Sequence, residues 1–391
     1  MFLQNAIKAD CMGCGACANV CPQKCISMET DDEGFLYPKI DESLCVKCHL
    51  CERVCPLDFN KFPQEIPDVY AGVHTNEDIV EKSSSGGAFT AIYNALLKEK
   101  FVVWGVKYDD NLHVVHGSAR NVQECEAFRK SKYVLSDTNF CYQKIERMLD
   151  EAENVLFVGT PCQCAALHKY LDAKKIKKDG LIVVDLICHG APNQELFDEY
   201  LREKEAKFNK KILSYSFKNK LPVKGTVNSR TAQIIFEDKS EALVGIEDDA
   251  FLKGYYSRLF YRPSCAKCKF ARKERVSDLT LGDAWQIEDI INDWNSLSGV
   301  SLILVNTEKG QHLVDLMNRE MSLKPVDLAW AMRTNSRLAR PTEMHKKRAI
   351  FFKLRHKYGF EKAVYTSTKR SFARKILSKG KRIIKKMLKK G

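Results

Sequence analysis

The chain has 391 residues, of which 45% are hydrophobic and 29% charged. This length and composition predict two or three folded domains and exclude a chain that is disordered as a whole. No uninterrupted run of about 18 apolar residues occurs, so no membrane-spanning helix is expected. Lys8, Asp10 and Cys11 come before any apolar segment, so no secretory signal is predicted and the cytoplasm is the expected compartment.

The net charge of +13 is concentrated at the C-terminal end, because residues 369–391 hold eleven Lys or Arg and no acid. The rest of the chain is nearly neutral and contains no recognised nucleic-acid motif, so no nucleic-acid partner is expected. From Phe372 to Leu388, apolar residues recur at helical spacing among the basic ones. This pattern predicts a basic amphipathic helix that binds an anionic membrane surface, peripherally on the inner face. A solvated or partner-bound terminal helix is the alternative.

Nine of the sixteen cysteines fall between Cys11 and Cys55. Eight of them form two C-x2-C-x2-C-x3-C runs, each followed by proline: Cys11, Cys14, Cys17 and Cys21, then Cys45, Cys48, Cys51 and Cys55. In such paired runs, the first three cysteines hold one 4Fe-4S cluster and the fourth ligates the other cluster. The spacing therefore predicts one cluster on Cys11, Cys14, Cys17 and Cys55, and another on Cys45, Cys48, Cys51 and Cys21.

The head, over roughly residues 5–60, resembles a bacterial two-cluster ferredoxin. A pair of zinc knuckles is the alternative, but zinc takes four ligands and does not account for the third cysteine and the proline of each run. Cys25 is left over and is interpreted as a small buried residue.

After a linker at 61–67, apolar runs and helical periodicities alternate along the chain. The pattern predicts strands at 69–73, 101–108, 154–158, 181–187, 212–217, 232–236, 279–282 and 301–305, helices at 88–98, 162–171, 194–204 and 311–317, and an exposed loop at 218–227. The expected fold is an α+β ferredoxin-like two-cluster head followed by an α/β domain with a mostly parallel or mixed sheet.

Two loops follow the carboxyl ends of predicted strands, Gly159 to Pro161 and Cys188 to Gly190. Such ends line the ligand crevice of an open α/β sheet, so we expect both loops to face one site. Ser83 to Gly87 precedes a helix and offers unpaired backbone N–H groups to a phosphate or pyrophosphate, although a flexible serine-glycine loop has the same pattern. His189 is a candidate proton donor or flavin-stabilising group, and an ordinary loop histidine is the alternative.

Cys265 and Cys268 form a single C-x2-C pair. Together with Cys162 and Cys188 they make a four-thiol set for a third 4Fe-4S cluster. The alternative is that Cys162, Cys164 and Cys188 only pack behind the sheet. Trp285 is expected in the core.

Five ordered motifs carry a family resemblance: KSSSGGAFT at 82–90, GTPCQ at 159–163, DLICHGAP at 185–192, the Cys265 and Cys268 pair, and DLTLGDAW at 278–285. Over about residues 65–330 the chain resembles the coenzyme F-420 hydrogenase/dehydrogenase beta-subunit family. The resemblance implies a flavoprotein with FAD and a 4Fe-4S cluster. It implies an FAD site lined by Ser84, Ser85, Gly86, Gly87, Gly159, Thr160, Gln163, His189 and Gly190, and a cluster on Cys162, Cys188, Cys265 and Cys268. Cys164, at a position expected to be apolar, and the basic tail depart from the family pattern.

The sequence therefore predicts an FAD- and 4Fe-4S-dependent oxidoreductase. Electrons would pass between the clusters and FAD, and to or from a two-electron carrier or substrate, either a deazaflavin-like coenzyme or a biosynthetic intermediate. The alternative is an electron-transfer subunit that docks on a separate catalytic protein. The expected partner is a ferredoxin, a flavodoxin or a dehydrogenase subunit. The expected parts are a cluster head at 1–60, a linker at 61–68, a body in two halves at 69–150 and 151–335, and a basic helical tail at 336–391.

Overall fold

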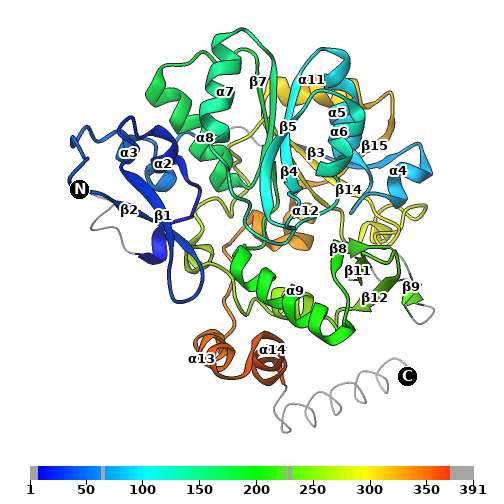
Figure 1. The fold of residues 1–391 in the computed structure, drawn as a ribbon. Helices are drawn as coiled ribbons and strands as arrows, with labels where there is room; N and C mark the ends of the chain where they lie inside the picture. Colours follow the sequence, from blue (N-terminus) through cyan, green and yellow to red (C-terminus); the bar gives the residue numbers. More distant parts are fainter. Residues whose placement is uncertain (1–7, 63–66, 221, 224–225, 228–230, 370–391) are drawn as a thin grey trace.

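The computed structural model describes residues 8–62, 67–220, 222–223, 226–227 and 231–369. The head lies at one side of the molecule, against α7 and α8 (Figure 1). Its elements are η1 (Lys8–Asp10), α2 (Ala16–Val20), the antiparallel strands β1 (Ile26–Thr30) and β2 (Leu36–Ile40), α3 (Leu50–Arg53) and η2 (Pro56–Asp58). These short elements leave the cysteines in the loops and first turns between them.

The body is built on one eight-stranded mixed sheet with the order β15-β3-β14-β13-β7-β6-β4-β5. Its strands are β3 (Asp68–His74), β4 (Val102–Tyr108), β5 (Val114–Ala119), β6 (Val155–Gly159), β7 (Leu181–Leu186), β13 (Leu279–Asp283), β14 (Ser301–Val305) and β15 (Met321–Pro325). The four central strands β13, β7, β6 and β4 are parallel, and both flanks are antiparallel. The sheet is therefore mixed rather than mostly parallel.

Helices cover both faces of this sheet, which is why β6 is buried along its whole length. Val155 and Phe157 pack with α7 and α8 on one face, and Leu156 and Val158 pack with α5 and α11 on the other. The helices are α4 (Glu77–Glu81), α5 (Ala88–Lys98), α6 (Val122–Cys125), α7 (Cys141–Asp150), α8 (Pro161–Lys174), α11 (Glu308–Met317) and α12 (Leu328–Thr334). Alternate residues of one strand thus reach two separate cores.

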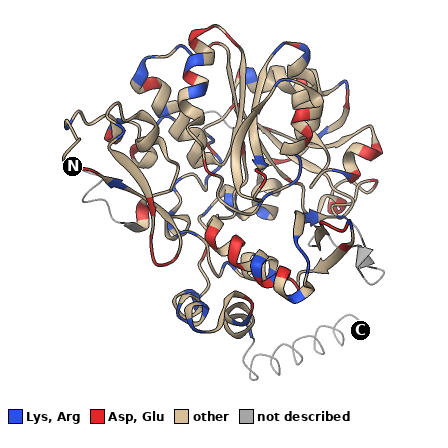
Figure 2. Cartoon of the chain, in the orientation of Figure 1, with Lys and Arg blue, Asp and Glu red and all other residues tan. Residues whose placement is uncertain are grey.

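A second, smaller unit lies below the sheet in Figure 1 and consists of a three-stranded sheet, β12-β11-β8, with four helices. It contains α9 (Gln194–Phe208), β8 (Ile212–Asn219), β11 (Thr231–Phe236), β12 (Glu241–Gly245), α10 (Ala250–Tyr256), α13 (Arg348–Tyr358) and α14 (Phe360–Thr368). The core of this unit is aromatic and includes Phe197, Tyr200, Phe251 and Phe360. Acidic and basic residues alternate along the outer side of α9 (Figure 2), in line with a nearly neutral body.

The remaining elements are short: β9 (Pro222–Val223), β10 (Thr226–Val227), η3 (Glu126–Phe128), η4 (Pro263–Lys267), η5 (Ile287–Asp289) and η6 (Ser336–Leu338). The described helices include none that is long and apolar enough to cross a membrane.

Most elements expected from the sequence are present, and the strands at β8 and β11 pair antiparallel. The loop expected at 218–227 was wrong at its start, because Lys218 and Asn219 belong to β8 and are buried. It was also wrong further along, because β9 and β10 lie within it and pair antiparallel. Lys218 is drawn inward by an ion pair with Asp283.

The first part of the expected tail packs on the body through α13 and α14, where Phe351 and Val364 are buried. The predicted amphipathic helix from Phe372 lies outside the described residues.

Candidate functional site

The head cysteines form two neighbouring groups. The proximal group consists of Cys11, Cys14, Cys17 and Cys55. Burial, and then the nearby Cys17, Cys55 and Cys11 thiols, raise the pKa of Cys14 well above its ordinary value. The fourth cysteine of the second run thus lies beside the first three cysteines of the first run, as the spacing predicts.

The distal group consists of Cys45, Cys48, Cys51 and Cys21, which line one small cavity. Cys25 also lines this cavity, is buried, and has its Sγ 3.4 Å from that of Cys21. Cys48 is exposed. Each group has one buried cysteine, Cys51 in the distal group and Cys14 in the proximal group, but only the distal group has an exposed one.

The inner group consists of Cys162, Cys188, Cys265 and Cys268, which line a cavity of about 40 Å³. Cys162 lies in the first turn of α8, Cys188 follows β7, and the pair belongs to the η4 turn. Burial, and then the charge of Cys268, raise the pKa of Cys162 to about 12. Three separate segments thus bring four thiols together.

Cys164 is not part of this group. Its side chain is fully buried in the core between α8 and the sheet, and its thiol donates to the carbonyl oxygen of Val184 at 3.7 Å. Two residues apart on a helix, Cys162 and Cys164 point in different directions, and only Cys162 reaches the inner cavity.

Among the described residues, no three His, Cys, Asp or Glu side chains are placed to hold a single metal ion. A mononuclear zinc site would need its sulfurs about 2.3 Å from one ion. A cuboidal 4Fe-4S cluster differs from such a site, because its four cysteine ligands sit on four separate iron atoms.

A much larger cavity of about 520 Å³ opens at the carboxyl ends of β6 and β7. Eight of the nine residues expected to line FAD border it, namely Ser84, Ser85, Gly87, Gly159, Thr160, Gln163, His189 and Gly190. Gly86 does not. It lies behind the loop, where a Cβ atom would come within 2.2 Å of the carbonyl oxygen of Gly72.

The serine-glycine loop offers fewer free donors than its sequence suggests. The backbone N–H groups of Gly86 and Ala88 both donate to Ser301 Oγ, at 3.0 and 3.4 Å. Ser85 Oγ donates to the carbonyl oxygen of Val300 at 2.8 Å, and Ser84 Oγ accepts from the N–H of Ser131 at 2.8 Å. These bonds hold the loop in place at the start of α5, whose first residues face the cavity.

Gln163 is fully buried and its hydrogen bonds are used within the fold. Its Oε1 accepts from the N–H and the hydroxyl of Thr160, at 3.1 and 2.9 Å, and its Nε2 donates to the carbonyl oxygen and the hydroxyl of Ser136. This is a capping arrangement at the start of α8. Gln163 therefore shapes the cavity wall by fixing the Thr160 loop.

His189 points into the large cavity, and its side chain is exposed to that space. Partial desolvation by the cavity wall, together with the positive charge of Arg337, lowers the pKa of His189 to about 4, although Asp283 acts in the opposite direction. The imidazole is therefore neutral at pH 7. A neutral ring can donate or accept a hydrogen bond, but it is a poor proton donor at that pH.

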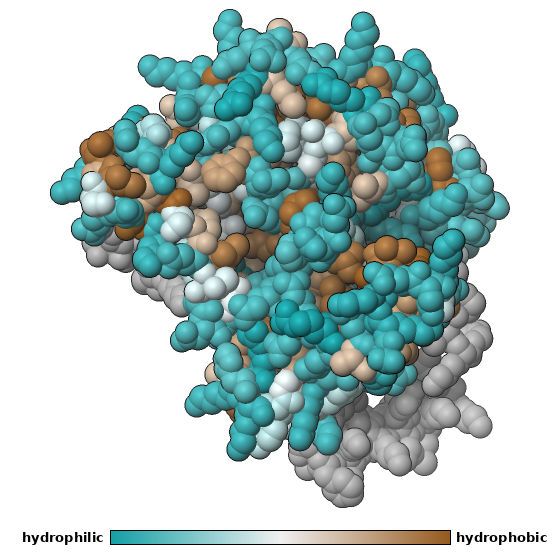
Figure 3. All heavy atoms as spheres, viewed as in Figure 1, coloured by the Kyte–Doolittle hydropathy of each residue, from teal (hydrophilic) through white to brown (hydrophobic). Residues whose placement is uncertain are grey.

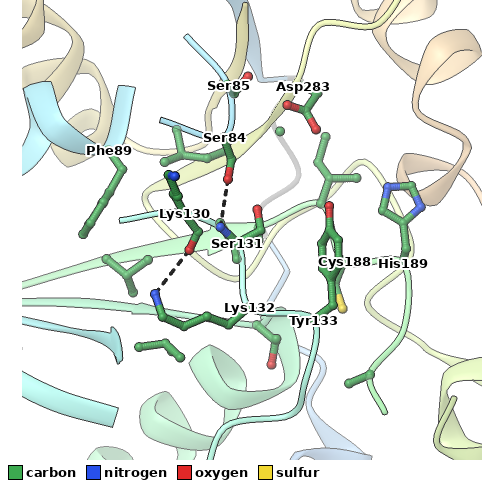
Figure 4. A pocket seen from close by; sticks show the side chains of 18 of the residues that line it. Ser84, Ser85, Phe89, Lys130, Ser131, Lys132, Tyr133, Cys188, His189 and Asp283 are labelled. Carbon is green, nitrogen blue, oxygen red and sulfur yellow. Dashed lines mark hydrogen bonds between the residues drawn. The ribbon is translucent and has the colours of Figure 1, made fainter. Parts of the chain in front are cut away.

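A basic segment that was not expected from the sequence also lines the large cavity and consists of Arg129, Lys130, Ser131, Lys132 and Tyr133. Figure 4 shows Lys130 and Lys132 on the side away from His189. Lys132 Nζ donates to the carbonyl oxygens of Arg129 and Lys130, at 2.9 and 3.3 Å. Burial, and then the charge of Lys130, lower the pKa of Lys132 to about 7. The clustering of three basic residues within four positions was the available signal.

Two more arginines from distant segments, Arg258 and Arg337, border the same cavity. The only acid on its wall in the described chain, Asp283, is neutralised by Lys218 Nζ at 2.7 and 2.8 Å. Arg337 is buried, and its Nη1 has no hydrogen-bond partner among the described residues. The cavity is therefore cationic.

Aromatic rings complete the wall. Tyr133 and Tyr255 stack with ring centroids 4.1 Å apart, and Tyr256, Tyr261 and Trp285 also border the space. Trp285, expected in the core, is thus partly a cavity residue. Flat rings beside cations suit a flat, anionic ligand.

The inner cysteine cavity and the large cavity share a wall. Cys188, His189, Gly190 and Arg337 border both. Gly190 has φ of +124° and a Cβ atom there would come within 2.2 Å of the Tyr261 ring, so only glycine fits this wall without rearrangement.

These features define a mixed-sheet α/β protein with a small iron–sulfur head, a class that transfers electrons. Family models match residues 69–140 as the N-terminal part, and 152–328 as the C-terminal part, of the coenzyme F420 hydrogenase/dehydrogenase beta subunit, and residues 10–59 as a 4Fe-4S dicluster domain. The chain belongs to the coenzyme F420 hydrogenase/dehydrogenase beta-subunit family and carries an N-terminal 4Fe-4S dicluster domain.

Two curated proteins match a short part of the chain. NADH-quinone oxidoreductase subunit I of Pelobacter propionicus is 33% identical over 69 residues, which is 16% of this chain and 37% of that protein. NADH-quinone oxidoreductase subunit I 2 of Geobacter metallireducens is 40% identical over 63 residues, which is 15% of this chain and 48% of that protein. The chain spans less than half the length of either.

Among solved structures, a chain of the F420-reducing [NiFe] hydrogenase complex from Methanosarcina barkeri aligns with a TM-score of 0.49 and 15% identity, over 72% of this chain and 91% of that one.

Proposed function

We propose that this protein is an oxidoreductase that passes electrons along three 4Fe-4S clusters to or from FAD in the large cavity. The observation that carries the proposal is the shared wall, because Cys188 and His189 border the inner cysteine cavity and the large cavity together. When bound, the clusters supply one-electron transfer and FAD supplies the exchange between one-electron and two-electron carriers.

The order of the cysteine groups supports a linear relay. The distal group lies at the surface, and Cys51 of that group is close enough to affect the pKa of Cys17 in the proximal group. Tyr142 lies between the proximal and the inner group. Its hydroxyl donates to the carbonyl oxygens of Cys14, a member of the proximal group, and of Gln163, the residue after Cys162, at 3.1 and 3.4 Å. All twelve cysteines are proposed as ligands.

The proposed FAD site has a positively charged part for the pyrophosphate and an aromatic part for the ring system. The start of α5, with Lys130, Lys132 and Arg129 nearby, supplies positive charge for the pyrophosphate. The tyrosines near Cys188 supply a flat apolar surface for the ring system. This places the ring end beside the inner cysteines.

The proton that accompanies two-electron transfer is assigned to Lys132 rather than to His189. A group works best as acid and base when its pKa is near the working pH. The pKa of Lys132 is lowered by burial to about 7, whereas that of His189 is lowered to about 4. In this proposal, His189 remains a neutral hydrogen-bonding group on the cavity wall.

The second candidate, an electron-transfer subunit that docks on a separate catalytic protein, is favoured by the surface of the head. Leu44 and Val46 flank Cys45 and are 55% and 61% exposed. Hydrophobic atoms reach the surface of the head in Figure 3. Apolar side chains beside a surface cysteine group suit a transient contact with a redox partner.

Anaerobic reconstitution tests both candidates. We expect about twelve iron atoms, matching sulfide, and one FAD per chain, on the ligation rules for 4Fe-4S clusters. A low-potential donor should then bleach the FAD absorbance through the clusters. An enzyme turns over a small two-electron acceptor after this reduction, whereas a subunit is reduced and stops. About eight iron atoms would remove the inner cluster, and bound zinc without sulfide would overturn the proposal.

A further inference from the structure

A buried arginine joins the head to the body. Arg262 is 1% exposed and belongs to neither the cysteine groups nor the wall of the large cavity. Its Nε donates to the carbonyl oxygen of Cys11 at 2.6 Å, and its Nη2 donates to the carbonyl oxygen of Leu36 at 2.8 Å and to Cys11 Sγ at 3.4 Å. The same guanidinium lies over the ring of Tyr37, with Cζ 4.3 Å from the centroid.

The backbone of Arg262 is tied to the inner group. Its carbonyl oxygen accepts from the N–H of Cys265 at 3.0 Å, and its own N–H donates to the carbonyl oxygen of Ala191 at 2.9 Å. Arg262 and Met12, the neighbour of Cys11, both line the inner cysteine cavity. One residue therefore contacts a ligand of the proximal group with its side chain and a ligand of the inner group with its backbone.

The positive charge of Arg262 has no carboxylate partner in the described chain. Within the described chain, its side-chain hydrogen bonds go to Cys11 and Leu36. Arg275, the other fully buried arginine beside the inner cysteines, instead pairs with Asp185 at 3.0 Å. A buried charge without a counter-charge is costly, so the arrangement requires an anionic group beside Arg262. Cys11 Sγ lies 3.4 Å from Arg262 Nη2 and would be a negatively charged thiolate as a cluster ligand.

Glycine makes room for this contact. Gly13 has φ of +69°, and a Cβ atom there would come within 2.8 Å of Arg262 Nη1. The Cys11 loop is therefore shaped so that the guanidinium can approach it closely.

We propose that Arg262 is a positioning residue that makes the proximal group the preferred electron site of the head. The inference rests on the proposed function, because it requires a 4Fe-4S cluster on Cys11, Cys14, Cys17 and Cys55. Reduction adds one electron, and so one negative charge, without moving a proton. A nearby cation and a hydrogen bond to a ligand sulfur stabilise the reduced state and raise its potential. An electron that enters at the surface-exposed distal group is thereby drawn toward the body.

The test is a redox titration of the reconstituted full chain, followed by electron paramagnetic resonance. In Arg262→Gln we expect one of the three cluster potentials to become more negative. The equilibrium constant for reducing that cluster should fall about tenfold, which corresponds to a shift of about 59 mV for one electron. The other two potentials should stay within error. In a second variant, Arg262→Lys, the retained charge should give a smaller shift of the same cluster, and this variant also covers a failure of Arg262→Gln to fold.

Arg348→Gln is the matched control. Arg348 lies near the same Phe35 ring and donates to the carbonyl oxygen of Tyr261 at 3.1 Å, but it pairs with Glu33 and does not touch a cysteine. Three unchanged potentials in folded Arg262→Gln with full iron and sulfide would overturn the role of Arg262 and leave the proposed function intact. Wild-type protein that takes up no iron and sulfide on reconstitution would overturn both the role of Arg262 and the proposed function.

Discussion

The eight paired cysteines of the head lie between positions 11 and 55, whereas the four of the inner group come from three segments between positions 162 and 268. The head cysteines are brought together by short turns, and each head group takes only one cysteine from the other run. The inner cysteines meet only because β7, the start of α8 and the η4 turn lie side by side. The same chemical group is therefore built locally in one region and by tertiary structure in the other.

This difference implies unequal consequences of losing a cysteine. Loss of a head cysteine should affect the head but not the binding of FAD, because no head cysteine borders the large cavity. A defect at Cys188 should spread, since this residue borders the inner and the large cavity.

The largest effect is expected for Cys188→Ala. This variant should lose about four of twelve iron atoms and most of its FAD, because one wall serves both sites. Cys48→Ala should also lose iron but keep FAD. Iron, sulfide and flavin analysis of both reconstituted proteins measures this.

Cys164→Ala is the control, since Cys164 is buried and does not line the inner cavity. This variant should keep all twelve iron atoms, on the same ligation rule. Equal FAD loss in Cys188→Ala and Cys48→Ala would contradict the conclusion that the head cysteines are separate from the FAD site.

Arg337→Met should give the next largest effect. Its buried guanidinium borders both cavities and has one nitrogen without a partner in the described chain. Hydrogen bonds from a charged donor contribute about 1.5–3 kcal/mol, so FAD should bind roughly 10- to 100-fold more weakly. Fluorescence titration with FAD measures the Kd. Arg333→Met, at an exposed position on α12, should leave the Kd unchanged, and an equal loss in both variants would argue against a local contact.

The pH dependence of FAD binding tests the contribution of Lys132 to the positive charge of the cavity wall. The pKa of Lys132 is lowered by burial and by Lys130 to about 7, so its charge is present below pH 7 and is lost as the pH rises through that value. The affinity of the wild-type protein for anionic FAD should therefore fall by about three- to tenfold between pH 6 and 8. Lys132→Met should bind with one weak affinity throughout. A wild-type profile that is flat over this range would contradict the assignment.

The smallest effect is expected for His189→Gln. Because desolvation lowers the pKa of His189 to about 4, its imidazole is neutral at pH 7 and is a poor general acid. Flavin reduction should slow by much less than the hundredfold or more that removal of a general acid costs. Stopped-flow reduction of the reconstituted variant measures the rate. A loss of a hundredfold, with iron and FAD intact, would restore His189 as the proton donor.

Much of the architecture was readable from the sequence. The periodicity at 88–98 corresponds to α5, and the apolar runs near 154 and 181 are the adjacent parallel strands β6 and β7. Burial on both faces makes such strands continuously apolar, which is a strong local signal. The edge of the unit around β8 was less visible, because Lys218 looks like a loop residue until Asp283 is placed beside it.

The family and the N-terminal 4Fe-4S dicluster domain could be recognised from the sequence alone, because cysteine spacing and ordered motifs are local properties of the chain. Only the tertiary structure decided that Cys162 and not Cys164 reaches the inner cavity, and that residues 129–133, 258 and 337 make the large cavity cationic. The lowered pKa of His189 also follows from the tertiary structure, since a pKa depends on desolvation and on neighbours that are distant in sequence. The same holds for Arg262, whose neighbour Cys11 lies 251 positions away in the chain.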